Sequence, residues 1–338
     1  MLLRLIEAGP WVSIQDSGRL GYQRYGIGPS GAMDPVSLAL ANRLVGNPPA
    51  TAALEIRAPG ITVVVEGGPV ALAVAAPEAR VALDGAPHAD NATVRLTPGQ
   101  RLRAGPGPGA AYAYLALAGG FALAEAFGSL SFHARSGIGG LGGRALAAGD
   151  ALPLVPPPPA VPDLVALAPP VHPALGDGPI RVIEGPQADH LAAEARAALY
   201  GEAWAVQPRS DRMGVRLAGT RLQHSAKGAE TISDGVVLGS IQVPGNGLPI
   251  VLGADRQTTG GYPKVAVVAR ADQPRFFQAP PGRTVRFAPI TRDQAVAALA
   301  AHRRAVADMR VVPAGRLPDT AALMAENLID GVYGGERD

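Results

Sequence analysis

Short runs of apolar, largely β-branched residues recur along the chain, and turns that contain glycine separate them. Runs of this length between Gly, Pro and Asn residues are typical of β-strands. The pattern therefore predicts a mainly β protein. The expected strands lie at 2–8, 11–14, 61–65, 70–74, 81–83, 93–96, 112–117, 180–183, 236–238, 241–243, 248–252, 265–269 and 285–287.

A few segments have helical spacing instead. The first follows Asp34, whose carboxylate can cap the helix while Pro35 takes the first helical position. Its apolar residues recur at helical spacing until Gly46 ends the segment. Further helices are expected at 187–199, after the capping-box pattern Thr291–Gln294 through 307, and at 319–328, the last two at the periphery.

A proline-rich stretch at 153–173 divides the chain. Proline stiffens the backbone and removes donors that a sheet needs, so this stretch predicts a semi-rigid linker. A chain of 338 residues is also longer than one hydrophobic core usually grows. We therefore expect a first domain at 1–155, the linker at 156–175 and a second domain at 176–338.

Three polar, glycine-bearing segments interrupt the strand pattern: Gln15–Asp34, Ser210–Gly214 and Asp255–Lys264. Polar loops held by a rigid sheet are common places for binding and catalysis. Each segment also has a purely structural alternative. The segment that begins at Asp255 could be a solvated loop, Asp34 could only cap the helix, and the 210–214 segment could be a bulged strand with an Asp–Arg pair. Lysine is rare here, because 30 basic residues include only Lys227 and Lys264, which singles out Lys264 as a point charge or tunable amine.

Composition and the missing motifs exclude several classes. A net charge of +2 does not suggest that the partner is a nucleic acid. The absence of cysteine excludes disulfides and thiolate nucleophiles. The six histidines have no metal-ligand spacing, so no metal is expected. The glycines at 137–142 fit a dinucleotide fingerprint, but no proper helix follows them, and no Walker A loop is present.

Neither a signal peptide nor a membrane span is expected, because the apolar runs are short and interrupted by glycine. A soluble protein in a reducing cytoplasm fits this pattern. The sequence also lacks a Met-Lys-Met biotin attachment site, so any biotin would be carried by another protein.

Several segments together resemble the biotin-dependent carboxyltransferase family, which includes allophanate hydrolase subunit 2, the KipA-like proteins and the C subunit of 5-oxoprolinase. The resemblance is near full length and implies two cyclophilin-like β-barrel domains. Leu130 and Phe132 stand where the family commonly has Arg and Thr. The matching segments read QDSGRLGY, SGAMD, ANRLVGN, LAGGF, LGSLSF, GGLGGRALAAGD, VQPRSDRMGVRL, SIQVPGNGLPIVL and DRQTTGGYPK.

The resemblance implies the C subunit of a 5-oxoprolinase complex, which opens 5-oxo-L-proline to L-glutamate in an ATP-dependent reaction. Its partners would be the A subunit of oxoprolinase together with a KipI-like B subunit, and the chain would be inactive alone. One alternative is carboxyl transfer from carboxybiotin, on a separate carrier, to urea or a related amide. Another is a KipA-like binding protein that antagonises a KipI-like kinase inhibitor and catalyses nothing itself.

These activities share an amide substrate. Positively charged donors would stabilise charge on its carbonyl oxygen, and a carboxylate would accept a proton. The candidate catalytic residues are Lys264, Asp255, Asp211 and Arg212, with Arg256 as a further donor and Asp16 as a further acceptor. The candidate substrate-binding residues are Gln15, Asp16, Arg19, Ser30, Met33, Gln242, Gln257, Thr258, Thr259, Gly260 and Gly261.

Overall fold

A computed structural model describes residues 1–156, 165–168 and 178–313. We refer to 1–156 as the N-terminal half and to 178–313 as the C-terminal half. The expected helix at 319–328 and much of the expected linker lie outside the described residues. The division into domains at 156–175 stays a prediction.

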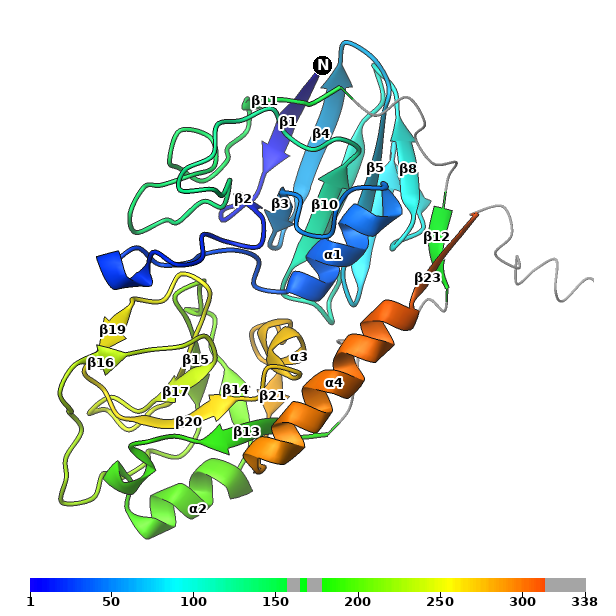
Figure 1. Ribbon diagram of the computed structural model, residues 1–338. Coiled ribbons are helices and arrows are strands. Elements are labelled where there is room, and N and C mark those ends of the chain that lie inside the picture. Colours follow the sequence, from blue (N-terminus) through cyan, green and yellow to red (C-terminus); the bar gives the residue numbers. More distant parts are fainter. Residues whose placement is uncertain (157–164, 169–177, 314–338) are drawn as a thin grey trace, which may run out of the picture.

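The N-terminal half contains two antiparallel sheets (Figure 1). The first has the order β11 (Ala151–Pro153), β1 (Leu2–Ala8), β4 (Ile61–Glu66), β9 (Leu102–Pro106), β6 (Ala79–Leu83) and β7 (Ala86–His88). The second has the order β2 (Ser13–Gln15), β3 (Ala53–Ile56), β10 (Ala113–Leu117), β5 (Val70–Ala75) and β8 (Thr93–Leu96).

One large sheet dominates the C-terminal half, and β13 and β22 form its parallel pair. Its order is β21 (Thr284–Val285), β14 (Trp204–Val206), β15 (Gly214–Ala218), β18 (Ile250–Leu252), β17 (Ser240–Gln242), β20 (Lys264–Val268), β13 (Ile180–Glu184) and β22 (Phe287–Pro289). Two small sheets pair β16 (Asp234–Gly235) with β19 (Thr259–Gly260), and β12 (Val165–Ala168) with β23 (Arg310–Pro313).

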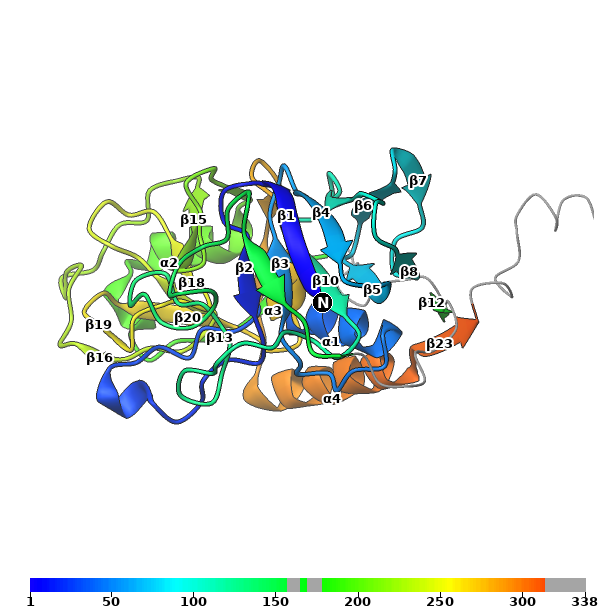
Figure 2. The same ribbon diagram turned by 90° about the horizontal axis from the view of Figure 1, so that it is seen from above.

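The predicted mainly β fold class is confirmed, and the longest described helix is peripheral. The helix α4 (Arg292–Asp308) begins with the predicted capping box of Thr291 and Gln294, and Ala295 is its buried residue. It runs along one side of the molecule and leads to β23 (Figures 1 and 2). The shorter helical segments are α2 (Ala193–Gly201), α3 (Gln273–Phe277), η1 (Gln23–Tyr25) and η2 (Ala188–His190).

The first helix, α1 (Pro35–Leu44), is capped as predicted but lies in the interior. The Asp34 carboxylate accepts hydrogen bonds from the backbone N–H groups of Val36 and Ser37. It also accepts one from the Gln278 side chain, which belongs to the C-terminal half. The cap therefore ties the two halves together as well as starting the helix.

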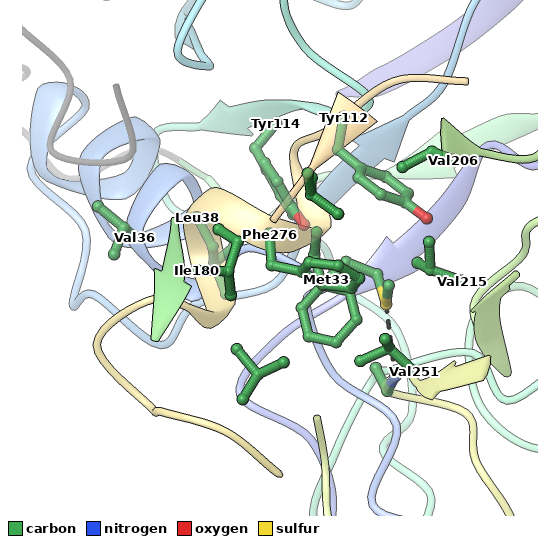
Figure 3. Packing of buried hydrophobic residues seen from close by; sticks show 14 of the residues in the cluster. Met33, Val36, Leu38, Tyr112, Tyr114, Ile180, Val206, Val215, Val251 and Phe276 are labelled. Atoms are coloured by element: carbon green, nitrogen blue, oxygen red, sulfur yellow. Dashed lines mark hydrogen bonds between the residues drawn. The ribbon is translucent and has the colours of Figure 1, made fainter. Parts of the chain in front are cut away.

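Both faces of the sheet that contains β10 are buried, because successive side chains of a strand point to opposite sides. Leu115 and Leu117 face a core inside the N-terminal half, where they pack with residues of β1, β3 and β4. Tyr112 and Tyr114 face a second cluster, which we call the shared core. Figure 3 shows residues of both halves in it: Met33, Val36, Leu38, Tyr112, Tyr114, Ile180, Val206, Val215, Val251 and Phe276.

Three local predictions are wrong. The strand expected at 285–287 is interrupted at Arg286, so β21 ends at Val285 and pairs with β14, while β22 begins at Phe287 and pairs with β13. Residues 236–238 are not a strand, because Val237 is exposed and Gly239 turns the chain at positive φ before β17 begins. The helix expected at 187–199 begins only at Ala193, because Leu191 is extended and pairs with His224.

No helix within the described residues is long and apolar enough to cross a membrane.

Candidate functional site

A pocket of about 280 Å³ lies where the two halves meet. Exposed residues, among them Trp11 and Arg135, mark its mouth, while Arg212 and Asp255 are buried at its floor. Three of the four predicted catalytic residues therefore line one cavity. The lining residues are Trp11, Ser13, Arg57, Phe132, Ala134, Arg135 and Ala145 from the N-terminal half, and Asp211, Arg212, Met213 and Asp255 from the C-terminal half.

A buried ion-pair network forms the floor. The Arg212 guanidinium donates to Asp255 through Nε at 2.9 Å and through Nη2 at 2.8 Å. Its Nη1 donates to Glu55 of β3 at 2.5 Å. One guanidinium thus joins a carboxylate from each half, and the paired geometry fixes its orientation.

Both members of the central pair are held in their ionised forms. Burial acts to lower the pKa of Arg212, but the Asp255 and Glu55 carboxylates outweigh it and raise that pKa well above its usual value. Burial acts to raise the pKa of Asp255, but the Arg212 charge and the hydrogen bonds from Arg212 and Ser30 hold that pKa below its usual value. The floor is therefore a fixed pair of charges in a poorly solvated place.

The 15–34 loop reaches the floor through two adjacent residues. The Ser30 hydroxyl lies 2.6 Å from Asp255 Oδ1, and the Gly31 carbonyl accepts from Arg212 Nη2 at 2.7 Å. Ser30 and Gly31 both have positive φ, a conformation that favours glycine at the second position. Met33 of the same loop is buried, and its sulfur accepts from the Ala254 N–H.

The other predicted residues of this loop support it from outside the pocket. Asp16 accepts from the Gly18 N–H, the Leu130 N–H and the hydroxyls of Ser129 and Ser131. A carboxylate with so many donors is a structural anchor. Arg19 and Gln15 act in the same way, because they donate to the backbone carbonyls of the 126–132 segment.

The two departures from the family motifs have different consequences. The Leu130 backbone N–H holds Asp16, a contact that does not depend on the side chain. Phe132 lines the pocket and gives it an apolar wall.

Lys264, the fourth predicted catalytic residue, is not among the residues that line the pocket. It is buried on β20 opposite Gln242 of β17, and its Nζ is 3.8 Å from the Asp234 carboxylate. Within the described residues this ammonium has no hydrogen-bond partner. The predicted segment Gln257, Thr258, Thr259, Gly260 and Gly261 runs beside it, with Thr259 and Gly260 forming β19 opposite β16.

Asp211 has one clear local role. Its Oδ1 accepts from the backbone N–H groups of Met213 and Gly214 at 2.8 and 3.1 Å, which fixes the turn before β15. Asp211 is also one of the residues that line the pocket. Asp211 therefore serves the turn and remains a candidate proton acceptor.

Sequence reasoning missed several residues of this site. Glu55 had a signal, since an isolated carboxylate inside the apolar strand 53–56 requires a buried partner. No sequence signal identifies Arg57, Arg135 or Trp11. Each lies in a loop, and only the packing of the two halves brings it to the pocket. His133 is buried nearby, and burial lowers its pKa despite the opposing field of Asp255.

Burial also lowers the pKa of Arg256, which follows Asp255. Within the described residues no ion pair joins Arg256 to a carboxylate, and no set of three or more His, Asp and Glu side chains could hold a metal.

Comparison with known proteins gives consistent matches. The family model described as carboxyltransferase domain, subdomain A and B, matches residues 25–289. The chain is 37% identical over 303 residues to the C subunit of 5-oxoprolinase from Escherichia coli, covering 88% of this chain and 94% of that protein. It is 33% identical over 300 residues to the C subunit of 5-oxoprolinase from Haemophilus influenzae, covering 87% of this chain and 93% of that protein.

A solved structure supports the same fold. The crystal structure of the Kluyveromyces lactis urea carboxylase matches with a TM-score of 0.82 and 30% identity, over 90% of this chain. Only 29% of that much longer protein is covered.

Proposed function

The chain belongs to the carboxyltransferase domain family, subdomain A and B, and on that basis we propose that it is the C subunit of a 5-oxoprolinase complex. The complex would hydrolyse 5-oxo-L-proline to L-glutamate in an ATP-dependent reaction. The observation that carries the proposal is the near full-length similarity, in both directions, to two 5-oxoprolinase C subunits.

The pocket has the chemistry that this reaction needs. Hydrolysis adds water to the lactam carbonyl carbon, breaks the C–N bond and places a proton on the leaving nitrogen. The charge that develops on the carbonyl oxygen is best stabilised by donors fixed in advance. Four of the five Arg212 N–H groups already donate to Asp255, Glu55 and Gly31, so our candidate donor is the second N–H of its Nη1. Asp211 lines the same cavity and is our candidate to take up a proton from water.

We assign ATP use to the assembled complex, because the chain has no recognisable phosphate-binding loop. The expected partners are the A subunit of oxoprolinase together with a KipI-like B subunit. The isolated chain is accordingly expected to be inactive.

A second candidate function is transfer of a carboxyl group from carboxybiotin to urea or a related amide. The similarity to the Kluyveromyces lactis urea carboxylase favours it, because the match covers nearly all of this chain. Both functions place an amide in the pocket. They differ in the co-substrate, which is ATP in one case and carboxybiotin on a separate carrier in the other.

Co-expression of the chain with the two expected partners tests the first candidate. We expect a stable hetero-oligomer that releases glutamate and ADP from 5-oxoproline and ATP, and no release when any one of the three proteins is left out. The matched control is Asp189→Asn, which should leave the rate unchanged because Asp189 forms an exposed ion pair with Lys227. Urea-dependent loss of carboxyl from a carboxybiotin carrier, with no glutamate formed, would favour the second candidate. Complex formation with neither turnover would favour the KipA-like alternative.

A further inference from the structure

Arg57 lines the pocket as an oriented cation that makes no ion pair with a described carboxylate. Its guanidinium lies over the Tyr112 ring, 5.5 Å from the ring centroid, and Nη1 donates to the Ser210 carbonyl at 3.3 Å. Both contacts orient the side chain and neither neutralises it. Within the described residues no ion pair to Arg57 is present.

Arg135 is a second cation at the mouth of the same pocket. It is exposed, and in the described part of the chain it makes no hydrogen bond or ion pair. The Arg212 charge, in contrast, already faces two carboxylates, Asp255 and Glu55. The lining therefore holds two cations that make no ion pair within the described residues, Arg57 and Arg135, and one further anion, Asp211. Its net charge beyond the Arg212 network is positive.

The shape and the lining restrict what such a pair of arginines would bind. A volume of about 280 Å³ is below that of pockets for drug-sized ligands. Trp11, Phe132 and Met213 provide apolar walls. A small ring with a carboxylate at one end and an amide at the other would match these features, because guanidinium groups are suited to carboxylates.

We propose that Arg57, assisted by Arg135, forms a carboxylate-binding subsite that selects an anionic amide over a neutral one. The inference rests on the proposed function, since it gives the carboxylate of 5-oxoproline to Arg57 and the lactam to the floor formed by Arg212 and Asp255. Urea and other neutral amides would leave Arg57 without a ligand partner. The subsite thus decides between the two amide chemistries that the family contains.

The test uses the assembled complex and a pair of matched lactams. 2-Pyrrolidinone has the same ring and amide as 5-oxoproline but lacks the carboxylate. In Arg57→Met we expect the KM for 5-oxoproline to rise by about 10–100-fold, as for loss of one charge-assisted contact, with kcat nearly unchanged. The inhibition constant of 2-pyrrolidinone should stay at the wild-type value. Arg135→Met should show a smaller change in the same direction, and Arg103→Met, on the exposed face of β9, should show none.

Two results would overturn the subsite. One is an unchanged KM for 5-oxoproline in Arg57→Met. The other is an equal rise in both constants, which would indicate general damage to the pocket. A melting temperature close to that of wild type confirms that each variant is folded.

Calorimetric titration of the isolated chain separates this inference from the proposed function. Wild type should bind 5-oxoproline more tightly than 2-pyrrolidinone, and Arg57→Met should lose that preference, whether or not the complex turns the substrate over. Absence of glutamate formation by the wild-type complex would reject the proposed function alone. Equal affinity of the wild-type chain for both lactams would reject the subsite alone.

Discussion

Arg212 and Asp255 lie 43 residues apart in the sequence and meet through two parallel hydrogen bonds of 2.9 and 2.8 Å. The same guanidinium continues to Glu55, 157 residues away in the other half. This three-residue network joins the two halves at the floor of the pocket. Stability and pocket geometry therefore depend on the same charges.

Asp255→Asn should be strongly destabilising. It removes one carboxylate from a buried guanidinium and leaves amide protons facing its donors, a change that typically costs about 3–5 kcal/mol. Urea denaturation of the chain measures this loss directly. Asp189→Asn is the control, because its partner Lys227 is largely exposed and such a pair contributes about 0–1 kcal/mol. Equal effects of the two substitutions would contradict the network.

His133 should make stability fall on mild acidification. Burial holds its pKa below the ordinary value of 6.5, so the folded state prefers the neutral ring. Above pH 6.5 this contribution is fully present. As the pH falls below 6.5 the unfolded chain binds the proton first, and stability is lost until the folded pKa is reached. His133→Gln should therefore flatten the decline in melting temperature between pH 7 and pH 5.

His302 provides the control for that experiment. Its pKa is lowered by burial too, but it lies on the peripheral helix α4. His302→Gln should also flatten the stability curve. Only His133→Gln should shift the pH profile of the complex activity, because the charges of Asp255, Arg19 and Arg212 act on His133. If both variants have the same pH profile of activity, His133 does not influence the chemistry of the site.

Gly31 should be far less tolerant of alanine than Gly26. Both have positive φ, which costs an alanine about 1–2 kcal/mol. A Cβ at Gly31 would also lie 3.0 Å from the Gly18 nitrogen, whereas one at Gly26 would meet nothing within 4 Å. Gly31→Ala should displace Ser30 from Asp255 and lower kcat/KM as well as stability. Gly26→Ala should lower stability alone, and comparable kinetics in the two variants would argue against this loop shaping the pocket.

Features set by neighbouring residues were predictable from the sequence. The Asp34 cap and the Thr291–Gln294 capping box are local hydrogen-bond patterns, and both form as expected. Most strands followed from apolar runs and turns. The exceptions have tertiary causes, since Leu191 pairs with His224 and delays the helix that its spacing favours.

The candidate site was less predictable, because its parts meet only through the fold. The polar loops marked Asp255, Arg212 and Ser30, and the structure brings these three together. Nothing local distinguishes Arg57 from an exposed arginine, and nothing places Glu55 opposite Arg212. The sequence likewise gives no sign that Asp16 accepts hydrogen bonds from the 126–132 segment, or that Arg19 donates to its carbonyls.

Lys264→Met separates a functional lysine from a structural one. The Lys264 side chain is only 4% exposed, and its nearest carboxylate, Asp234 at 3.8 Å, is on the surface. Because a desolvated ammonium without a hydrogen bond is unfavourable, a methionine of similar length should leave stability unchanged or raise it. If Lys264 serves the complex as a donor, turnover should fall by about 10²–10³-fold in the same variant. Lys227→Met, at the exposed lysine, should change neither quantity. Marked destabilisation of Lys264→Met with wild-type turnover would assign Lys264 to the fold alone.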